Sequence, residues 1–273
     1  MSTTSQAPKP PRRFALLSAS SSQVHDAPRL RGIVFDMDGT LCLPQNYMFK
    51  EMRSKLGIPK SVDILEHILS LSDKPDDSSS SSSPRSRAQE AIKDIEREAM
   101  DRQQPQPGLN ELITYLAKNN LRISLCTRNF ELPVKHLLEK FVNEDARSHF
   151  HPLVTREAQG IQPKPSPEGI WACVHAWDNE IEDAIKSREA LQEYLGSTSE
   201  QDKVKSCEGV IMVGDSVDDI EAGARAGAAT VLLVNEENKH LLEATEWPRR
   251  VDLSISRLDE LADVLEKGFC GRD

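Results

Sequence analysis

Short apolar runs alternate along this chain with longer stretches in which apolar residues recur every three or four positions. The first pattern is typical of strands buried in a sheet, and the second of helices with one buried face. The apolar runs predict strands over residues 30–38, 121–127, 150–155, 209–215, 230–234 and 251–255. The periodic stretches predict helices over residues 109–120, 131–141, 166–177, 216–227 and 256–268, and an acidic helix through residue 194. This order favours an α/β protein whose mostly parallel sheet has helices on both faces.

The segment at residues 44–104 departs from this alternation. It contains two helical patterns, over residues 62–72 and 86–103, and Ser61 is a candidate N-cap for the first. A serine run between the two patterns predicts a flexible loop at about residues 73–85, because serine cannot bury apolar surface.

The N-terminal segment is different again. Residues 1–28 are polar, rich in Pro and Ser, and without periodicity, which predicts a disordered tail. Its arginines and serines weakly resemble a transit peptide, but a tail is the simpler interpretation. We therefore expect a tail at 1–28, a core formed by 29–43 and 105–273, and a small helical unit at 44–104.

Charge narrows the class of partner. The chain has 273 residues, a hydrophobic fraction of 38% and a formal net charge of −10. Basic residues are concentrated before residue 32, so the remainder is more acidic still. Such a body would repel the phosphates of a nucleic acid outside the tail, whereas it suits a site for a divalent metal.

Cysteine usage and hydropathy narrow the compartment. The five cysteines are an odd number without a CxxC pair, which argues against a disulfide framework or a structural zinc site. No apolar stretch is long enough to cross a bilayer. We expect an intracellular, cytoplasmic protein without a membrane partner, the nucleus and then the mitochondrion being the alternatives.

Polar residues collect where the predicted strands end. In parallel α/β sheets, ligands bind at the carboxyl ends of the strands, so these residues are the candidates for a functional site. Eight of them follow a strand closely, and a lysine lies in the loop before the helix at 166–177. The candidates are Asp36, Asp38, Gly39, Thr127, Arg128, Asn129, Lys164, Asp215 and Asp219.

The chemistry of these residues is that of phosphoryl transfer. Clustered carboxylates repel one another, and Mg²⁺ would remove the repulsion because it takes hard oxygen ligands. Asp36 is then a candidate nucleophile that forms an aspartyl-phosphate, and Asp38 a candidate general acid and base. Thr127 offers a hydroxyl and Lys164 a positive charge to the phosphoryl oxygens. Gly39 permits a turn that brings backbone N–H groups close to the phosphate.

Single residues of this set have simpler interpretations. Lys164 alone would be a solvated surface lysine, and Thr127 alone an ordinary hydroxyl at a strand end. Arg128 and Asn129 either touch the substrate or cap the helix that follows. It is the ordered set that favours a common site.

The ordered set resembles the four motifs of the haloacid dehalogenase-like hydrolase superfamily. The matching segments are DMDGT, Thr127 after a buried strand, KPSP and GDSVDD. The resemblance covers about residues 30–235, apart from 44–104. It implies a Rossmann-like three-layer core with a mobile cap, and the segment at 44–104 fills the place of a helical cap between the first two motifs.

The resemblance also implies a role for each matching residue. Asp36 matches the nucleophile and Asp38 the acid and base, while Thr127 and Lys164 match the groups that bind the phosphate. The implied Mg²⁺ ligands are Asp36, Asp38 through its backbone carbonyl, Asp215, and Asp219 through a water molecule. Haloacid dehalogenases lack an acid at the place of Asp38, so its presence points to phosphoryl transfer. Leu43 departs from the acid that phosphoglycolate phosphatases and sugar phosphomutases of this type usually carry.

These features predict a Mg²⁺-dependent phosphatase that hydrolyses a small phosphorylated metabolite through an aspartyl-phosphate. A sugar phosphomutase of the same superfamily is an alternative, because it shares every motif. A non-catalytic protein that binds a phosphorylated metabolite is a second alternative. The substrate and the oligomeric state stay open.

Overall fold

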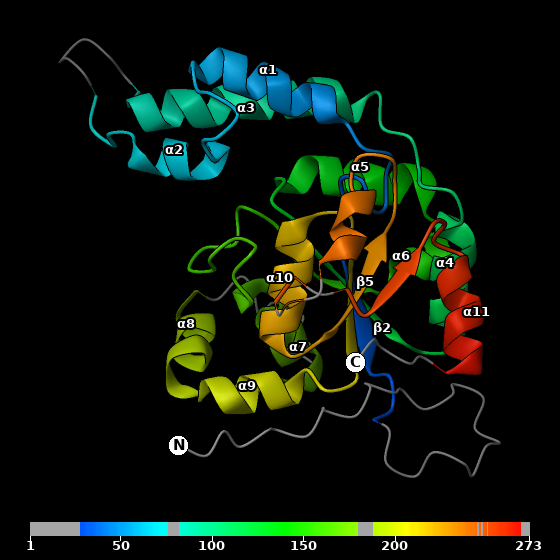
Figure 1. Cartoon of the computed structure of the whole chain (residues 1–273). Helices are drawn as coiled ribbons and strands as arrows, with labels where there is room; N and C mark the ends of the chain where they lie inside the picture. Colours follow the sequence, from blue (N-terminus) through cyan, green and yellow to red (C-terminus); the bar gives the residue numbers. More distant parts are fainter. Residues whose placement is uncertain are drawn as a thin grey trace, which may run out of the picture.

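A six-stranded sheet forms the centre of the molecule (Figure 1), with all strands parallel and in the order β3-β2-β1-β4-β5-β6. The computed structural model describes residues 28–75, 82–179, 188–244, 246, 248–249 and 251–268. The strands are β1 (Gly32–Phe35), β2 (Arg122–Cys126), β3 (Phe150–Val154), β4 (Val210–Gly214), β5 (Ala229–Leu233) and β6 (Leu253–Ile255). Each corresponds to a predicted strand, and the expected α/β class is confirmed.

The central strands are buried on both sides, which explains their unbroken apolar sequences. Every residue of β1 and of β4 is buried. β1 pairs with β2 and β4 so that Phe35 is opposite both Leu125 and Val213. The three strands therefore end level, and the residues that follow them meet at one edge of the sheet.

Helices cover both faces of the sheet, because alternate residues of a strand point to opposite sides. Ile33 and Phe35 pack among the helices of one face, and Val34 among those of the other. The first face carries α4 (Leu109–Lys118), α5 (Glu131–Phe141), α6 (Glu144–Arg147) and α11 (Glu260–Lys267). The second carries α7 (Glu168–Asn179), α8 (Arg188–Ser197), α9 (Glu200–Ser206) and α10 (Val217–Ala226). A 3-10 helix, η1 (Lys239–Glu243), follows β5.

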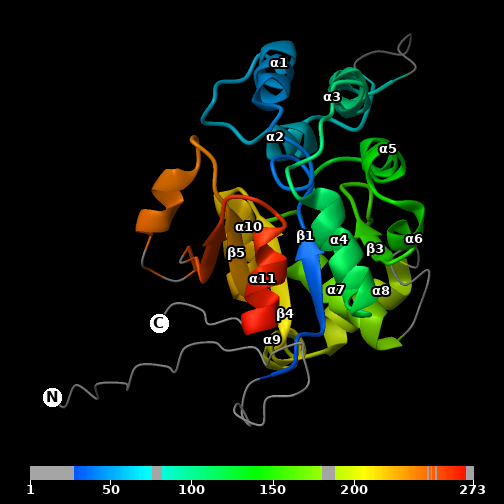
Figure 2. The same cartoon turned by 90° about the vertical axis from the view of Figure 1, so that its right-hand side faces the viewer.

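Three further helices lie over the end of the sheet to which β1 points (Figure 2). They are α1 (Asn46–Leu56), α2 (Ile64–Ser70) and α3 (Pro84–Met100). We call residues 44–104 the insert. Its helices pack around a buried apolar cluster of their own, which includes Met48, Ile68 and Ile92. The insert therefore buries its apolar surface independently of the clusters that flank the sheet.

The sequence pattern does not predict α1. Only Met48 and Met52 of its 11 residues are buried, so the apolar stripe is too thin to stand out. The end of α1 carries a clearer signal, because Gly57 adopts the left-handed conformation with a φ of 67° and caps the helix. The helices α6 and α9 and the 3-10 helix η1 are likewise unpredicted, since each is too short to show a period.

The start of α2 also differs from expectation. Ser61 is not its N-cap, because the chain still turns there, with the Val62 N–H donating to the Pro59 carbonyl at 3.1 Å. The N-cap is Asp63, whose carboxylate accepts two backbone N–H groups of the first turn at 2.9 and 3.0 Å. This shift of two residues places a carboxylate at the inner end of α2.

Some expectations concern residues outside the described ranges. These are the tail before residue 28, residues 76–81 of the predicted serine-rich loop, and residues 180–187 of the predicted acidic helix. Within the described ranges, no helix combines the length and the apolar character that a membrane span requires.

The separate cluster of the insert can be tested with a matched pair of substitutions. Ile92 is 1% exposed and Leu69 is 57% exposed. We expect Ile92→Ala to lower the free energy of unfolding by about 2–5 kcal/mol, because it removes buried methyl groups and leaves a cavity. Leu69→Ala should change it by less than about 0.5 kcal/mol. Urea denaturation followed by circular dichroism measures both, and equal effects would contradict the role given to this cluster.

Candidate active site

A cavity of about 260 Å³ lies between the insert and the carboxyl ends of β1, β2 and β4. The structure brings eight of the nine candidate residues to its wall. They are Asp36, Asp38, Thr127, Arg128, Asn129, Lys164, Asp215 and Asp219. Gly39, the ninth, lies directly against the Asp215 carboxylate. Level strand ends thus gather side chains from four separate parts of the chain.

Three carboxylates meet where β1 and β4 end. One oxygen each of Asp36, Asp215 and Asp219 lies within 4.8 Å of the other two. Lys164 Nζ donates to Asp36 Oδ1 at 2.5 Å and to Asp219 Oδ1 at 2.6 Å, and its side chain is 3% exposed. One buried ammonium therefore pairs with two of the three carboxylates.

The pKa values of this cluster indicate that its negative charge is incompletely balanced. Burial raises the pKa of Asp36 to about 7, although Lys164 opposes the shift. Burial, with Asp219 and Asp36 nearby, raises the pKa of Asp215 to about 8. Burial alone would lower the pKa of Lys164, but Asp219 and Asp36 raise it above its ordinary value. A hard divalent cation such as Mg²⁺ fits this donor set, because it takes carboxylate oxygens and stabilises their ionised form.

Hydrogen bonds from the neighbouring loops hold two of these carboxylates. Ser216 and Asp219 form a capping box at the start of α10, in which the Ser216 hydroxyl donates to Asp219 Oδ2 at 2.7 Å. Asn238 Nδ2 donates to the backbone oxygen of Asp215 at 2.7 Å, and Asn235 Nδ2 to Asp215 Oδ2 at 3.4 Å. Neither asparagine is among the candidates drawn from the sequence. The one available signal was their place just after β5, at another strand end.

Asp38 lies beside this cluster and has an amide as its hydrogen-bond partner. Asn129 Nδ2 donates to Asp38 Oδ2 at 3.0 Å, and Cys42 Sγ lies 3.7 Å from Asp38 Oδ1. Burial raises the pKa of Asp38, while the hydrogen bonds from Asn129 and Cys42 oppose the shift. A raised pKa extends the pH range in which this carboxyl group carries a proton that it can donate.

The loop after β2 connects the site with the insert. The Thr127 hydroxyl accepts the Asn129 N–H at 3.1 Å. The Arg128 guanidinium pairs with Asp218 at 2.7 Å and with Asp63, the N-cap of α2. Since Asp218 belongs to α10 and Asp63 to the insert, Arg128 bridges the two sides of the cavity. Phosphate binding by Arg128 and Asn129 stays a prediction.

The insert contributes a wall that the sequence analysis missed. More than half of its lining residues are apolar: Pro44, Met48, Phe49, Met52, Ile64, Leu65 and Ile92. Glu96 of α3 and Arg156, just after β3, also line the cavity and form an ion pair with two bonds of 2.7 Å. Neither residue belongs to a motif, and only tertiary packing brings them together.

Comparison with known proteins gives consistent matches. A family model for haloacid dehalogenase-like hydrolases matches residues 30–227. The uncharacterized hydrolase YOR131C of Saccharomyces cerevisiae is 35% identical over 238 residues, which cover 87% of this chain and 91% of that protein. The haloacid dehalogenase-like hydrolase domain-containing protein At2g33255 of Arabidopsis thaliana is 30% identical over 252 residues, covering 88% and 86%.

Solved structures with lower identity support the fold. CbbY from Rhodobacter sphaeroides, in complex with phosphate, matches 85% of this chain and 96% of that chain, with a TM-score of 0.54 and 18% identity. A hydrolase from Pseudomonas syringae matches 87% of this chain and 98% of that chain, with a TM-score of 0.56 and 17% identity. The expected Rossmann-like architecture is confirmed.

The contact between Gly39 and Asp215 generates a first prediction. Gly39 has a φ of 86°, and a Cβ there would lie 2.1 Å from Asp215 Oδ2. Gly39→Ala should displace this carboxylate and weaken Mg²⁺ binding about tenfold or more. Gly57→Ala is the matched control, because Gly57 has a φ of 67° but nothing within 4 Å of its Cβ. Isothermal titration calorimetry measures the affinities, and equal values for the two variants would contradict this positioning role.

The unbalanced charge of the cluster generates a second prediction. Asp215→Asn removes one of three mutually repelling carboxylates, so in EDTA the variant should unfold with a free energy about 1–2 kcal/mol higher than the wild type. Added Mg²⁺ should raise the melting temperature of the wild type and leave that of the variant nearly unchanged. Differential scanning calorimetry with and without Mg²⁺ measures both effects. A variant that is less stable in EDTA and equally stabilised by Mg²⁺ would refute the assignment of this cluster.

Proposed function

This chain belongs to the haloacid dehalogenase-like hydrolase family, and from this premise we propose that it is a Mg²⁺-dependent phosphatase of a small phosphomonoester. The observation that carries the proposal is the cluster of Asp36, Asp215 and Asp219 around Lys164, with Asp38 beside it. The cluster combines a nucleophile, a fixed positive charge and a set of metal ligands, and Asp38 adds a proton donor. These are the parts that hydrolysis of a phosphate ester requires.

The phosphate group would lie against the ends of β1 and β2. Lys164 and the Thr127 hydroxyl both line the cavity there and can bind the phosphoryl oxygens. Mg²⁺ would be held by Asp36, Asp215 and Asp219 with the backbone carbonyl of Asp38, and would add positive charge beside the same oxygens. Asp36 also lines the cavity, so its carboxylate can reach the phosphorus atom there.

The reaction divides into two displacements at phosphorus. In the first, a carboxylate oxygen of Asp36 bonds to phosphorus, the bond from phosphorus to the leaving oxygen breaks, and Asp38 gives its proton to that oxygen. In the second, a water molecule attacks the aspartyl-phosphate, Asp38 takes a proton from it, and the bond from phosphorus to Asp36 breaks. Lys164 pairs with Asp36 at 2.5 Å and can keep the departing carboxylate ionised.

The insert would act as a cap during these steps. Its mostly apolar wall lines the side of the cavity away from the strand ends, where the leaving group would lie, and closure there would exclude bulk water. Arg53 of α1 lines the same wall and adds a positive charge. We therefore expect a compact leaving group that fills a space of about 260 Å³ together with the phosphate.

Phosphate release is the direct test of this function. The panel would contain sugar phosphates, phosphoglycolate, nucleotides, pyridoxal phosphate and p-nitrophenyl phosphate. We expect Mg²⁺-dependent release from at least one of them, and Asp36→Asn should lower kcat by about a thousandfold or more. Asp145→Asn is the matched control, because Asp145 is exposed on α6, away from the cavity.

The outcomes separate this proposal from its alternatives. An isomerised sugar phosphate without net phosphate release would identify a phosphomutase. Binding of a phosphate ester without any turnover would identify a non-catalytic binding protein. Full turnover by Asp36→Asn would contradict the aspartyl-phosphate route itself.

A further inference from the structure

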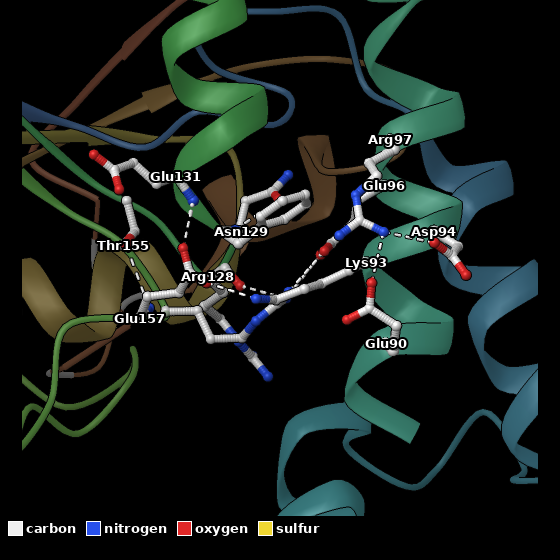
Figure 3. Close-up of polar contacts among 12 residues, drawn as sticks. Glu90, Lys93, Asp94, Glu96, Arg97, Arg128, Asn129, Glu131, Thr155 and Glu157 are labelled. Carbon is white, nitrogen blue, oxygen red and sulfur yellow. Dashed lines mark hydrogen bonds and ion pairs between the residues drawn. The ribbon is translucent and has the colours of Figure 1, made fainter. Parts of the chain in front are cut away.

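A buried ion pair joins the insert to the loop that follows β3. Both terminal nitrogens of the Arg156 guanidinium fork donate to the Glu96 carboxylate, each at a distance of 2.7 Å. The Glu96 side chain is 3% exposed and that of Arg156 is 17% exposed. Figure 3 shows Glu96 projecting from α3 towards the loop that carries Arg128 and Asn129. The pair therefore spans the boundary between the insert and the core.

Packing alone does not account for a carboxylate at this position. The buried residues of α3 are Ala88, Ile92, Glu96 and Ala99, so Glu96 interrupts an apolar stripe. Burial raises the pKa of Glu96 although Arg156 opposes the shift, which shows that the site is costly for a charge. An apolar side chain of similar volume would often stabilise such a position at least as well. The distinctive contribution of the pair is therefore geometric, because its two parallel hydrogen bonds fix the orientation of both side chains.

Arg156 transmits this geometry to the loop after β2. Its guanidinium donates to the backbone oxygen of Arg128 at 3.1 Å, and its backbone N–H donates to the backbone oxygen of Asn129 at 2.8 Å. Two consecutive carbonyls of that loop thus depend on one arginine. The fork that Glu96 occupies fixes the orientation of the guanidinium that binds the first of them.

The loop after β2 also contacts Asp38, the proposed acid and base. Asn129 is 5% exposed, its N–H donates to the Thr127 hydroxyl at 3.1 Å, and its amide donates to Asp38 Oδ2 at 3.0 Å. The Arg156 guanidinium therefore links Glu96 to the Arg128 carbonyl, which belongs to the peptide bond of Asn129, and the Asn129 amide binds Asp38. Each contact is between groups with little freedom to reorient, since the residues involved are largely buried.

We propose that Glu96 is a positioning residue that couples the closed position of the insert to the orientation of Asp38. The inference rests on the proposed function, because it assigns proton transfer to Asp38. When the insert is in place, Glu96 orients the Arg156 guanidinium, which holds the carbonyl of the Arg128–Asn129 peptide bond, and the Asn129 amide holds Asp38 towards the leaving oxygen. When the insert withdraws, this support is lost, so proton transfer is restricted to the closed cavity.

The chain offers a matched control for this relay. Lys93 lies one turn before Glu96 on α3. It pairs with Glu157, which follows Arg156 in the loop after β3, at 2.6 Å (Figure 3). This pair also joins the insert to the core, but its side chains are 27% and 41% exposed. Lys93→Gln therefore removes an ion pair across the same boundary, together with the contact of Lys93 Nζ with the Phe130 ring at 5.3 Å, while the hydrogen bonds of the Arg156 guanidinium stay in place. Glu96→Gln removes the charge and one arm of the fork at nearly constant volume.

Two aryl esters of similar shape reveal whether the proton donor is affected. Phenyl phosphate needs more protonation of its leaving oxygen than p-nitrophenyl phosphate does. We expect Glu96→Gln to lower kcat for phenyl phosphate about tenfold, and kcat for p-nitrophenyl phosphate less than about threefold. Lys93→Gln should leave both values within about twofold of the wild type. An equal loss with both esters, or no loss with either, would overturn the proposal.

A second measurement keeps this test separate from that of the function. The side-chain amide signal of Asn129 in a ¹H–¹⁵N correlation spectrum, assigned by comparison with Asn129→Ala, reports on its bond to Asp38. We expect the signal to shift in Glu96→Gln and not in Lys93→Gln, while the Mg²⁺-induced rise in melting temperature persists in both. An unchanged signal in Glu96→Gln would overturn the relay. If the wild type releases phosphate neither from these two esters nor from any other member of the panel, the proposed function fails, and this spectrum still tests the relay.

Discussion

The pairing of one lysine with two carboxylates is the interaction on which the rest of this structure depends. Lys164 is 128 residues from Asp36 and 55 from Asp219 in sequence, and the fold brings them within 2.6 Å. Without this ammonium, the ends of β1 and β4 and the first turn of α10 would place three repelling carboxylates together, two of them buried. The parallel sheet brings the repelling carboxylates together, and Lys164 in the loop before α7 neutralises part of their charge.

Lys164 balances this charge only in part, because three carboxylates share one lysine. The remaining negative charge has a consequence for what the cluster can bind. The remaining charge favours a cation, because burial together with Asp219 and Asp36 raises the pKa of Asp215 to about 8 and so disfavours its ionised form. The surrounding residues hold the carboxylates against their repulsion: the capping box fixes Asp219, and Asn238 fixes the backbone of Asp215. Proteins commonly accept a less stable arrangement at an active site for the sake of activity.

The sequence was sufficient for the sheet and for the candidate residues, and insufficient for the boundary between insert and core. Strands such as GIVF can be predicted from their unbroken apolar composition. The residues that follow them meet because neighbouring parallel strands end at the same edge of the sheet. The helix α1 was missed because two buried methionines make a faint stripe. The contacts of Arg156 with Glu96 were missed for another reason. The two residues are 60 positions apart, and an Arg or a Glu in a sequence is equally consistent with an ordinary solvent-exposed surface. The roles of the candidate residues stay predictions.

The central claim is that Asp36 accepts the phosphoryl group, and trapping that intermediate tests it most directly. Asp38→Asn should still be phosphorylated by acetyl phosphate, whose leaving group needs no proton, but should lose the base that activates water. Mass spectrometry of the proteolysed variant after incubation with Mg²⁺ would locate the modification. A phosphoryl group on the peptide that contains Asp36, absent from a variant that also carries Asp36→Asn, is the predicted result. A phosphoryl group on another residue, or none while the wild type turns over, would contradict the account.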